Sequence, residues 1–214
     1  MILDNVPDVD VNAISSEGIP LLSMMISCGA FNAVKCLLRI PNVDVNAKSQ
    51  YGVPLLILTE HFNYRRRVSA LDLMHSFSKR PDLDVNILNY GETALHWAIR
   101  WFYPDINDDE DFNKEAYTHC VLGMIEIFSS SLDPNIKDQD GETVLTLSIR
   151  RNMKEVALRL LDIPGIDINA TNREGINAPL LVMKQLTKSN TTFLDGWTWW
   201  DVAQKMLDKK DIQL

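Results

Sequence analysis

The hydrophobic pattern of residues 20–39 predicts two short helices. Apolar side chains fall at the spacing that places them on one face of a helix, first along 20–28 and then along 31–39. Pro20 fits the first turn, where no backbone N–H is needed. The apolar positions are Leu21, Leu22, Met25, Ile26, Val34, Leu37 and Leu38. We expect these side chains to form a core, and we expect Cys36 to be a buried thiol because it lies in the same apolar run.

The same pattern repeats along the chain. Residues 132–169 contain a polar turn, two short helices and a closing Asp-Ile-Asn that copies the Asp-Pro-Asn at their start. Asp-x-Asn ends at Asn12, Asn46, Asn86, Asn135 and Asn169, and glycines follow at Gly18, Gly52, Gly91, Gly141 and Gly175. Asparagine spacings of 34, 40, 49 and 34 residues indicate five units, with extra residues in the second, third and fifth. Asp and Asn suit tight turns because their side chains bond nearby backbone groups.

Long connections interrupt the second and third units. An Arg-Arg-Arg run at 65–67 lies in the first connection, and an acidic insertion at 104–111 lies in the second, between helices expected at 93–102 and 115–128. Both connections join an inner helix to an outer one, so we expect them to contact each other. The insertion also matches the first four ligand positions of a calcium loop, but it lacks the turn glycine and the twelfth-position acid. Partner recognition is a third use.

The last unit ends in a helix predicted at 198–209. Thr198 and Asp201 fit a variant capping box, with Asp in place of the usual Glu or Gln. Three tryptophans, Trp197, Trp199 and Trp200, cluster at its start. We expect one or two of them to seal the last interface while the rest shield the open end, and the alternative is an exposed aromatic patch for a partner.

These motifs resemble the ankyrin repeat. Residues 91–98 (GETALHWA) stand close to the family's Thr-Pro-Leu-His-x-Ala motif, with Ala94 in place of proline, and residues 141–145 and 151–161 match other parts of the repeat. The resemblance covers nearly the whole chain. It implies an all-α ankyrin-repeat solenoid of about five helix–turn–helix units with short β-turn fingers. The expected single array, 1–214, divides approximately into units 7–41, 42–81, 82–131, 132–165 and 166–214.

The resemblance also implies where a partner binds. In this family the turn tips and inner helices line a concave face, and the position after the motif histidine varies and points into that face. The expected partner-binding residues are Met24, Tyr51, Leu58, Tyr90, Trp97, Leu147, Asp140 and Arg173. Trp97 could instead pack between adjacent inner helices, and Trp101 and Tyr103 could belong to the core. His96 is expected to bond the backbone of a neighbouring unit.

Charge and composition exclude several classes of function. A net charge of −8 argues against sequence-independent binding of nucleic acid, which needs a basic surface. No stretch approaches the ~20 apolar residues that span a bilayer, and no secretory signal peptide is visible. Three cysteines without paired spacing fit a reducing compartment. We therefore expect a cytoplasmic monomer without cofactor, metal or membrane insertion.

The leading interpretation is a non-catalytic adaptor that binds another protein through its concave face and insertions. His119 and Cys120 are neighbours on a predicted helix, so their side chains diverge and do not form a nucleophile–base pair. The irregular insertions resemble those of ankyrin proteins that intracellular bacteria deliver into host cells as effectors. The alternative is a substrate-targeting fragment of a larger enzyme, suggested by a start in mid-repeat and the Trp-rich end.

Overall fold

The chain forms two compact units, Met1–Asp84 and Val85–Leu214, each built from helix pairs. The computed structural model describes residues 10–50, 52–60, 67–101, 114–188 and 198–209. The first unit contains α1 (Leu21–Ser27), α2 (Phe31–Leu37), α3 (Pro54–Glu60) and α4 (Arg67–Phe77). The second contains α5 (Ala94–Arg100), α6 (Lys114–Phe128), α7 (Val144–Arg150), α8 (Lys154–Leu160), α9 (Ala178–Lys188) and α10 (Trp199–Leu207).

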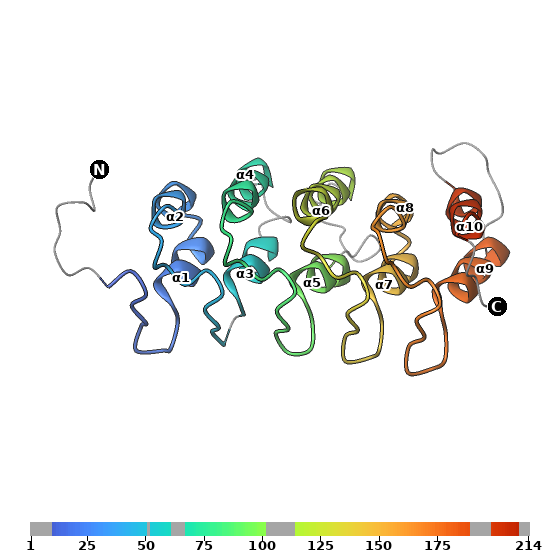
Figure 1. The fold of residues 1–214 in the computed structure, drawn as a ribbon, viewed down its shortest axis with the longest axis horizontal. Helices are drawn as coiled ribbons and strands as arrows, with labels where there is room; N and C mark the ends of the chain where they lie inside the picture. Colours follow the sequence, from blue (N-terminus) through green and yellow to red (C-terminus); the bar gives the residue numbers. More distant parts are fainter. Residues whose placement is uncertain (1–9, 51, 61–66, 102–113, 189–197, 210–214) are drawn as a thin grey trace. The chain divides into compact units, whose positions relative to one another are not determined.

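Within each unit the helices form two layers (Figure 1). In the first unit α1 packs on α3 and α2 packs on α4, while the pairs α1–α2 and α3–α4 join the layers. In the second unit α5, α7 and α9 form the inner layer, and α6, α8 and α10 form the outer one. Each helix therefore packs on its own partner and on its equivalents in adjacent pairs, which is the contact pattern of a repeat protein.

The bounds predicted from the sequence, 20–28, 31–39, 93–102, 115–128 and 198–209, agree with α1, α2, α5, α6 and α10 to within two residues. The variant capping box is confirmed, because the Thr198 side chain accepts from the Asp201 backbone N–H and the Asp201 carboxylate accepts from the Thr198 backbone N–H. The apolar positions of the first helix pair are buried at Leu22, Ile26, Val34, Leu37 and Leu38 and half-buried at Leu21 and Met25. Hydrophobic period thus located both the elements and most of their core face.

One sequence expectation of burial, for Cys36, and one alternative, for Trp101, are wrong. Cys36 is exposed, because α2 buries the face that carries Phe31, Val34 and Leu37, and Cys36 follows Val34 by two residues and so turns away from it. Trp101 is 45% exposed rather than core, because it caps the end of α5 and its ring leans on Trp97, with the centroids 5.5 Å apart.

The turns between helix pairs carry short fingers. Among the described residues, the fingers close through isolated antiparallel bridges, Ile14 with Pro20, Ser49 with Gly52, Asn89 with Glu92 and Lys137 with Thr143. In the third finger the two central residues, Tyr90 and Gly91, both have positive φ, at 49° and 77°. That pair of values is typical of the tight two-residue hairpin turn, and Tyr90 is an unusual residue there because glycine and asparagine are preferred.

Asparagine side chains bridge each finger base to the next repeat. The Asn135 amide donates to the Gly165 carbonyl (2.8 Å), and its oxygen accepts from the Asp167 N–H (2.7 Å). The same two bonds run from Asn12 to Asn42 and Asp44, from Asn46 to Asp82 and Asp84, and from Asn86 to Ser131 and Asp133. The Asp-x-Asn mark is therefore a joint between repeats as well as a turn.

Arg80 makes a different joint inside the first unit. Its guanidinium donates to the carbonyls of Ile40 (2.9 Å) and Val43 (2.8 Å), which lie one repeat earlier, and it pairs with Asp82 (2.8 Å). The hydrogen bond with Asp82 raises the pKa of Arg80 and lowers the pKa of Asp82. The equivalent position is the apolar Ile163 in the second unit, so a polar side chain here has replaced a core contact with bonds to backbone.

The asparagine joint can be tested with Asn135→Ala. Loss of both bonds leaves the Asp167 N–H and the Gly165 carbonyl without their partner, and we expect the free energy of unfolding to fall by about 1–3 kcal/mol. Urea denaturation measures the change. Asn32→Ala, at an exposed position of α2, is the control and should change stability little. An Asn135→Ala protein as stable as the control would show that the bridge contributes nothing.

Candidate partner-binding surface

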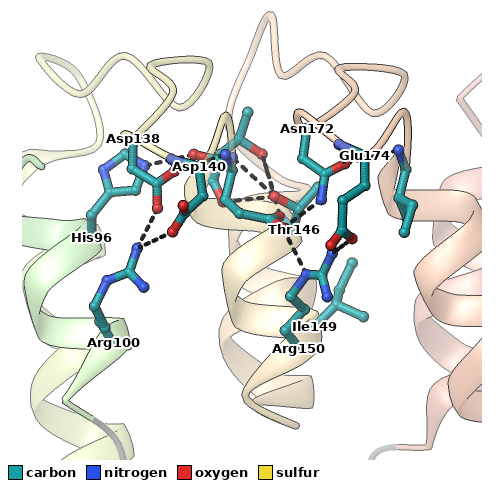
Figure 2. A network of polar contacts seen from close by, with 12 residues as sticks. His96, Arg100, Asp138, Asp140, Thr146, Ile149, Arg150, Asn172 and Glu174 are labelled. Atoms are coloured by element: carbon teal, nitrogen blue, oxygen red, sulfur yellow. Dashed lines mark hydrogen bonds and ion pairs between the residues drawn. The ribbon is translucent and has the colours of Figure 1, made fainter. Parts of the chain in front are cut away.

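Arg100, the last residue of α5, ties the third finger to the fourth (Figure 2). It pairs with Glu92 of its own finger and with Asp138 of the next, and Asp140 lies 3.9 Å from its Nη2. The Asp138 side chain is fully buried, while that of Arg100 is 27% exposed. Burial raises the pKa of Glu92, and Arg100 opposes that rise. The guanidinium is therefore held by buried carboxylates at the edge of solvent.

Arg150 repeats this arrangement one ankyrin-like repeat later, within the same compact unit. It is the last residue of α7, and its Nε pairs with Glu142 (2.7 Å) while its Nη2 pairs with Glu174 of the next finger (3.1 Å). Asn172 adds a second link, since its amide donates to Glu142 Oε1 (2.7 Å). Sequence reasoning missed both arginines. The signal was present, because each follows a Gly-Glu-Thr by the same number of residues.

The fingers themselves are shaped by an acceptor at their base. Asp138 Oδ1 accepts from the backbone N–H groups of Asp140 and Glu142, both at 2.8 Å. Asn172 Oδ1 does the same one repeat later, accepting from the N–H groups of Glu174 and Ile176 at 2.9 Å. Asp and Asn side chains favour such turns because they bond backbone two residues ahead. The bonds fix where the fingertip side chains stand.

His96 links the inner helices to the fingers from below. Its Nδ1 lies 2.8 Å from Thr93 Oγ1 and its Nε2 lies 3.2 Å from the Glu142 carbonyl oxygen. A carbonyl can only accept, so Nε2 carries the proton and donates to Glu142, and Nδ1 accepts from the Thr93 hydroxyl. This confirms that His96 bonds the backbone of the neighbouring repeat. Burial lowers the pKa of His96, while Asp138 opposes that change and Arg100 adds to it.

A pocket of about 430 Å³ opens between the fourth and fifth fingers and the ends of the inner helices. It is lined by four arginines, three carboxylates, Leu147 and Asn172. The arginines are Arg100, Arg150, Arg151 and Arg173, and the carboxylates are those of Asp140, Glu142 and Glu174. The pocket therefore combines the paired guanidiniums described above with two further basic residues.

Comparison with solved structures identifies the fold. No protein-family model matches the sequence. The structure is similar to that of EF0377, an ankyrin repeat protein, with a TM-score of 0.64 and 14% identity over 96% of this chain and 85% of that one. It is also similar to an ankyrin repeat domain (ABAYE2397) from Acinetobacter baumannii AYE, with a TM-score of 0.67 and 16% identity over 94% of this chain and 86% of that one. The chain has the ankyrin-repeat fold.

The ankyrin-repeat alignment correctly places part of the expected partner-binding set at the surface. Tyr90 is 67% exposed and Met24 is 42% exposed, while Trp97 is half-buried against Trp101. The fingertip residues Asp140 and Arg173 are exposed. Tyr51 lies outside the described residues. Whether any of these side chains contacts a partner stays a prediction.

Two residues expected to face outward are buried. Leu58 is fully buried and Leu147 is 3% exposed. Each belongs to an inner helix with neighbours on more than one side, since α3 packs on α1 and α4, and α7 packs on α5, α8 and α9. Trp97, at the position equivalent to Leu147, is half-buried, and Met24, at the same position of α1, is 42% exposed. Since methionine and leucine are similar in size, side-chain size alone does not decide exposure at this position.

The tryptophan cluster at the last helix is divided. Trp199 is 3% exposed, and its indole N–H donates to Asn152 Oδ1 (3.2 Å) in the neighbouring repeat. Trp200 is 58% exposed, and Trp197 lies outside the described residues. One tryptophan therefore seals an interface between repeats, as expected, while its neighbour faces solvent.

Several sequence hypotheses fall on residues outside the described ranges. They include Arg65 and Arg66, the acidic insertion 104–111 and Tyr103, so contact between the connections and calcium binding stay hypotheses. The side chain of Arg67, at the start of α4, is likewise not described. Among the described residues, no group of three or more His, Cys, Asp or Glu could hold a metal ion, and no helix is long and apolar enough to cross a membrane. His119 is exposed and Cys120 is buried.

Titration of His96 provides a test of the linkage between helix and finger. Its pKa in the folded protein lies below the ordinary 6.5, so its contribution to stability is fully present above pH 6.5 and is lost as the pH falls below it. We expect the wild type to lose stability more steeply than His96→Gln as the pH falls below 6.5, by at most ~1.4 kcal/mol per pH unit. Urea unfolding at several pH values measures both slopes. Glu92 titrates in both proteins, so its effect cancels in the comparison. Equal dependence of stability on pH in the two proteins would contradict the lowered pKa of His96.

Gly141 and Gly175 form a matched pair for testing how tightly neighbouring fingers pack. Both have positive φ, at 78° and 75°. A Cβ on Gly141 would lie 3.0 Å from the Arg173 backbone nitrogen, whereas around Gly175 the described residues leave open space. We expect both alanine variants to lose about 1 kcal/mol from the backbone conformation, and Gly141→Ala to lose about 1–3 kcal/mol more from the clash. Equal melting temperatures for the two variants would mean that the fingers separate easily.

Proposed function

We propose that the chain is a non-catalytic protein-binding module that uses the fingers and inner helices of its second unit. The ankyrin-repeat fold is the general support, because that fold commonly serves as a protein-interaction module. The resemblance to the ankyrin repeat also implies that a partner binds the face lined by the turn tips and inner helices. More specifically, we propose that the protein is a cytoplasmic monomer that acts in a host cell as a bacterial effector. The irregular insertions in the sequence support this more specific proposal.

The observation that carries the proposal is that Tyr90 combines an unfavourable backbone conformation with an exposed side chain. A tyrosine at φ 49° is held in a conformation that costs of order 1 kcal/mol relative to glycine or asparagine. The surrounding structure holds it there, because the Gln139 side chain donates to the Tyr90 carbonyl and covers the adjacent Gly91. Its side chain nevertheless stays 67% exposed, so the ring gains little from burial. A large aromatic ring on a rigid fingertip is suited to anchor a partner.

Trp97 adds a second aromatic anchor on the inner helix. It packs against Trp101 with an interplanar angle of 47°, and Trp101 is itself 45% exposed. The two rings lie one helical turn apart on α5 and present an indole surface beside solvent. Tryptophan and tyrosine supply large contact areas at low conformational-entropy cost, which is why binding energy concentrates on them.

The double variant Tyr90→Asn, Trp97→Ala tests this function. Asn tolerates the positive φ of residue 90, so the fold should survive while both rings are lost. Partner proteins are first identified by crosslinking to the intact chain, and the affinity of the purified partner is then measured by calorimetry. We expect the double variant to bind at least about tenfold more weakly than the wild type.

Arg159→Ala, Leu207→Ala provides the matched control for that experiment. It removes two exposed side chains, 45% and 62% exposed, from the outer-layer helices α8 and α10. The control protein should bind its partner with wild-type affinity. Equal weakening by both double variants, or no specific partner for the intact chain, would overturn the proposed function.

A further inference from the structure

We infer that the pocket between the fourth and fifth fingers binds a carboxylate side chain from an acidic segment of the protein partner. This inference rests on the proposed function and adds the chemistry of the partner. It is carried by Arg100 and Arg150, which line the pocket from equivalent positions in successive repeats. Arg173, from the fifth finger, lines it as well.

Both helix-end arginines keep donors unused. A guanidinium has five N–H donors, and carboxylates pair only with Nε and Nη2 of Arg100 and of Arg150; at Arg100 Nε the pairing with Glu92 makes no aligned hydrogen bond. Within the part of the chain that the structure describes, neither Nη1 has a hydrogen-bond partner, and neither does the guanidinium of Arg173. Three arginines of the pocket therefore retain N–H groups that can donate to an incoming anion.

The network holds these donors in place before any partner arrives. Arg150 is fixed by Glu142, whose side chain is only 7% exposed, and by Glu174 on the fingertip. Arg100 is fixed by the fully buried Asp138 and by Glu92. The backbone of Arg173 is also anchored, because its N–H donates to the Asp140 carbonyl (3.1 Å). Little side-chain entropy remains to be lost at the helix-end arginines on binding, which favours recognition by a planar fork of donors.

Charge selects the class of ligand. Four arginines and three carboxylates line the pocket, and Glu92 and Asp138 neutralise Arg100 from behind the lining, so the positive charge left for a ligand is at most that of Arg173, which forms no ion pair within the described residues. A monoanionic Asp or Glu side chain matches that single charge. A phosphoryl group brings nearly two negative charges and would be opposed more strongly by the rim carboxylates of Asp140 and Glu174. We therefore assign the site to carboxylates rather than to phosphorylated residues.

The pocket has apolar neighbours that define the partner further. Leu147 lines it but is only 3% exposed, so the apolar surface open to a partner is that of the half-buried Trp97 on α5, which packs beside α7. An extended partner segment that lays an apolar side chain on Trp97 can place an adjacent Asp or Glu in the pocket. The expected recognition sequence is therefore an acidic residue next to an apolar one.

The probe is the N-acetylated, C-amidated peptide Gly-Glu-Leu-Glu-Gly, added to the full ¹⁵N-labelled chain and followed by NMR, including the arginine Nε–H signals. We expect the signals of Arg100 and Arg150 to shift when the peptide binds. We expect the peptide with Gln in place of Glu to bind at least about fivefold more weakly. Arg173→Glu should lower the affinity of the protein for the Glu peptide by about fivefold. Arg159→Glu, an equal charge change at a 45% exposed position of α8, should leave its affinity within about twofold.

Three results of the peptide measurements would overturn this inference. They are equal binding of the Glu and Gln peptides, equal weakening by Arg173→Glu and Arg159→Glu, and tighter binding of the corresponding phosphoserine peptide. Melting curves of both charge variants check that the fold is retained. A natural partner whose binding depends on Tyr90 and Trp97 but tolerates Arg173→Glu would also overturn the inference, and it would leave the proposed function intact.

Discussion

Hydrogen bonds from one repeat to the next are the constraint on which the rest of the structure depends. Apolar contacts between short helices are non-directional, so they favour stacking without fixing how far one helix pair slides along the next. The asparagine amides supply that register, because each offers one donor and one acceptor to a fixed backbone pair in the following repeat. With the register set, the inner helices place Arg100 and Arg150 within reach of the next finger.

The second unit adds a buried polar layer above its apolar core. His96, Asp138 and Glu142 are each less than a tenth exposed, and burying such groups is costly unless they are bonded. Here the bonds run between repeats, from His96 to the Glu142 carbonyl and from Arg100 to Asp138. The layer therefore makes finger position depend on helix position. A binding surface built on these fingers inherits the rigidity of the helices beneath them.

Sequence pattern was sufficient for whatever is local. Helix bounds and the Thr198 capping box followed from period and motif, because each depends on a few neighbouring residues. The His96 bond to the next repeat is not local, and it was predicted only through the resemblance to the ankyrin motif. Exposure at the variable inner-helix position did not follow, since it depends on what packs around each side chain: Leu58 and Leu147 are buried there, while Met24 is exposed and Trp97 is half-buried. The arginine links also escaped, because their partners lie up to 40 residues away and only folding brings them together.

The asparagine joint has a consequence for how such a chain can grow. Each Asp-x-Asn presents the same two hydrogen-bonding atoms to whatever follows, and each successor offers a carbonyl and an N–H at matching places. The hydrogen bonds between repeats therefore keep the same geometry whatever residues lie between successive Asp-x-Asn motifs. Gene duplication can add or remove a whole repeat without new contacts having to evolve at the seam, while the helices and fingertips in between diverge.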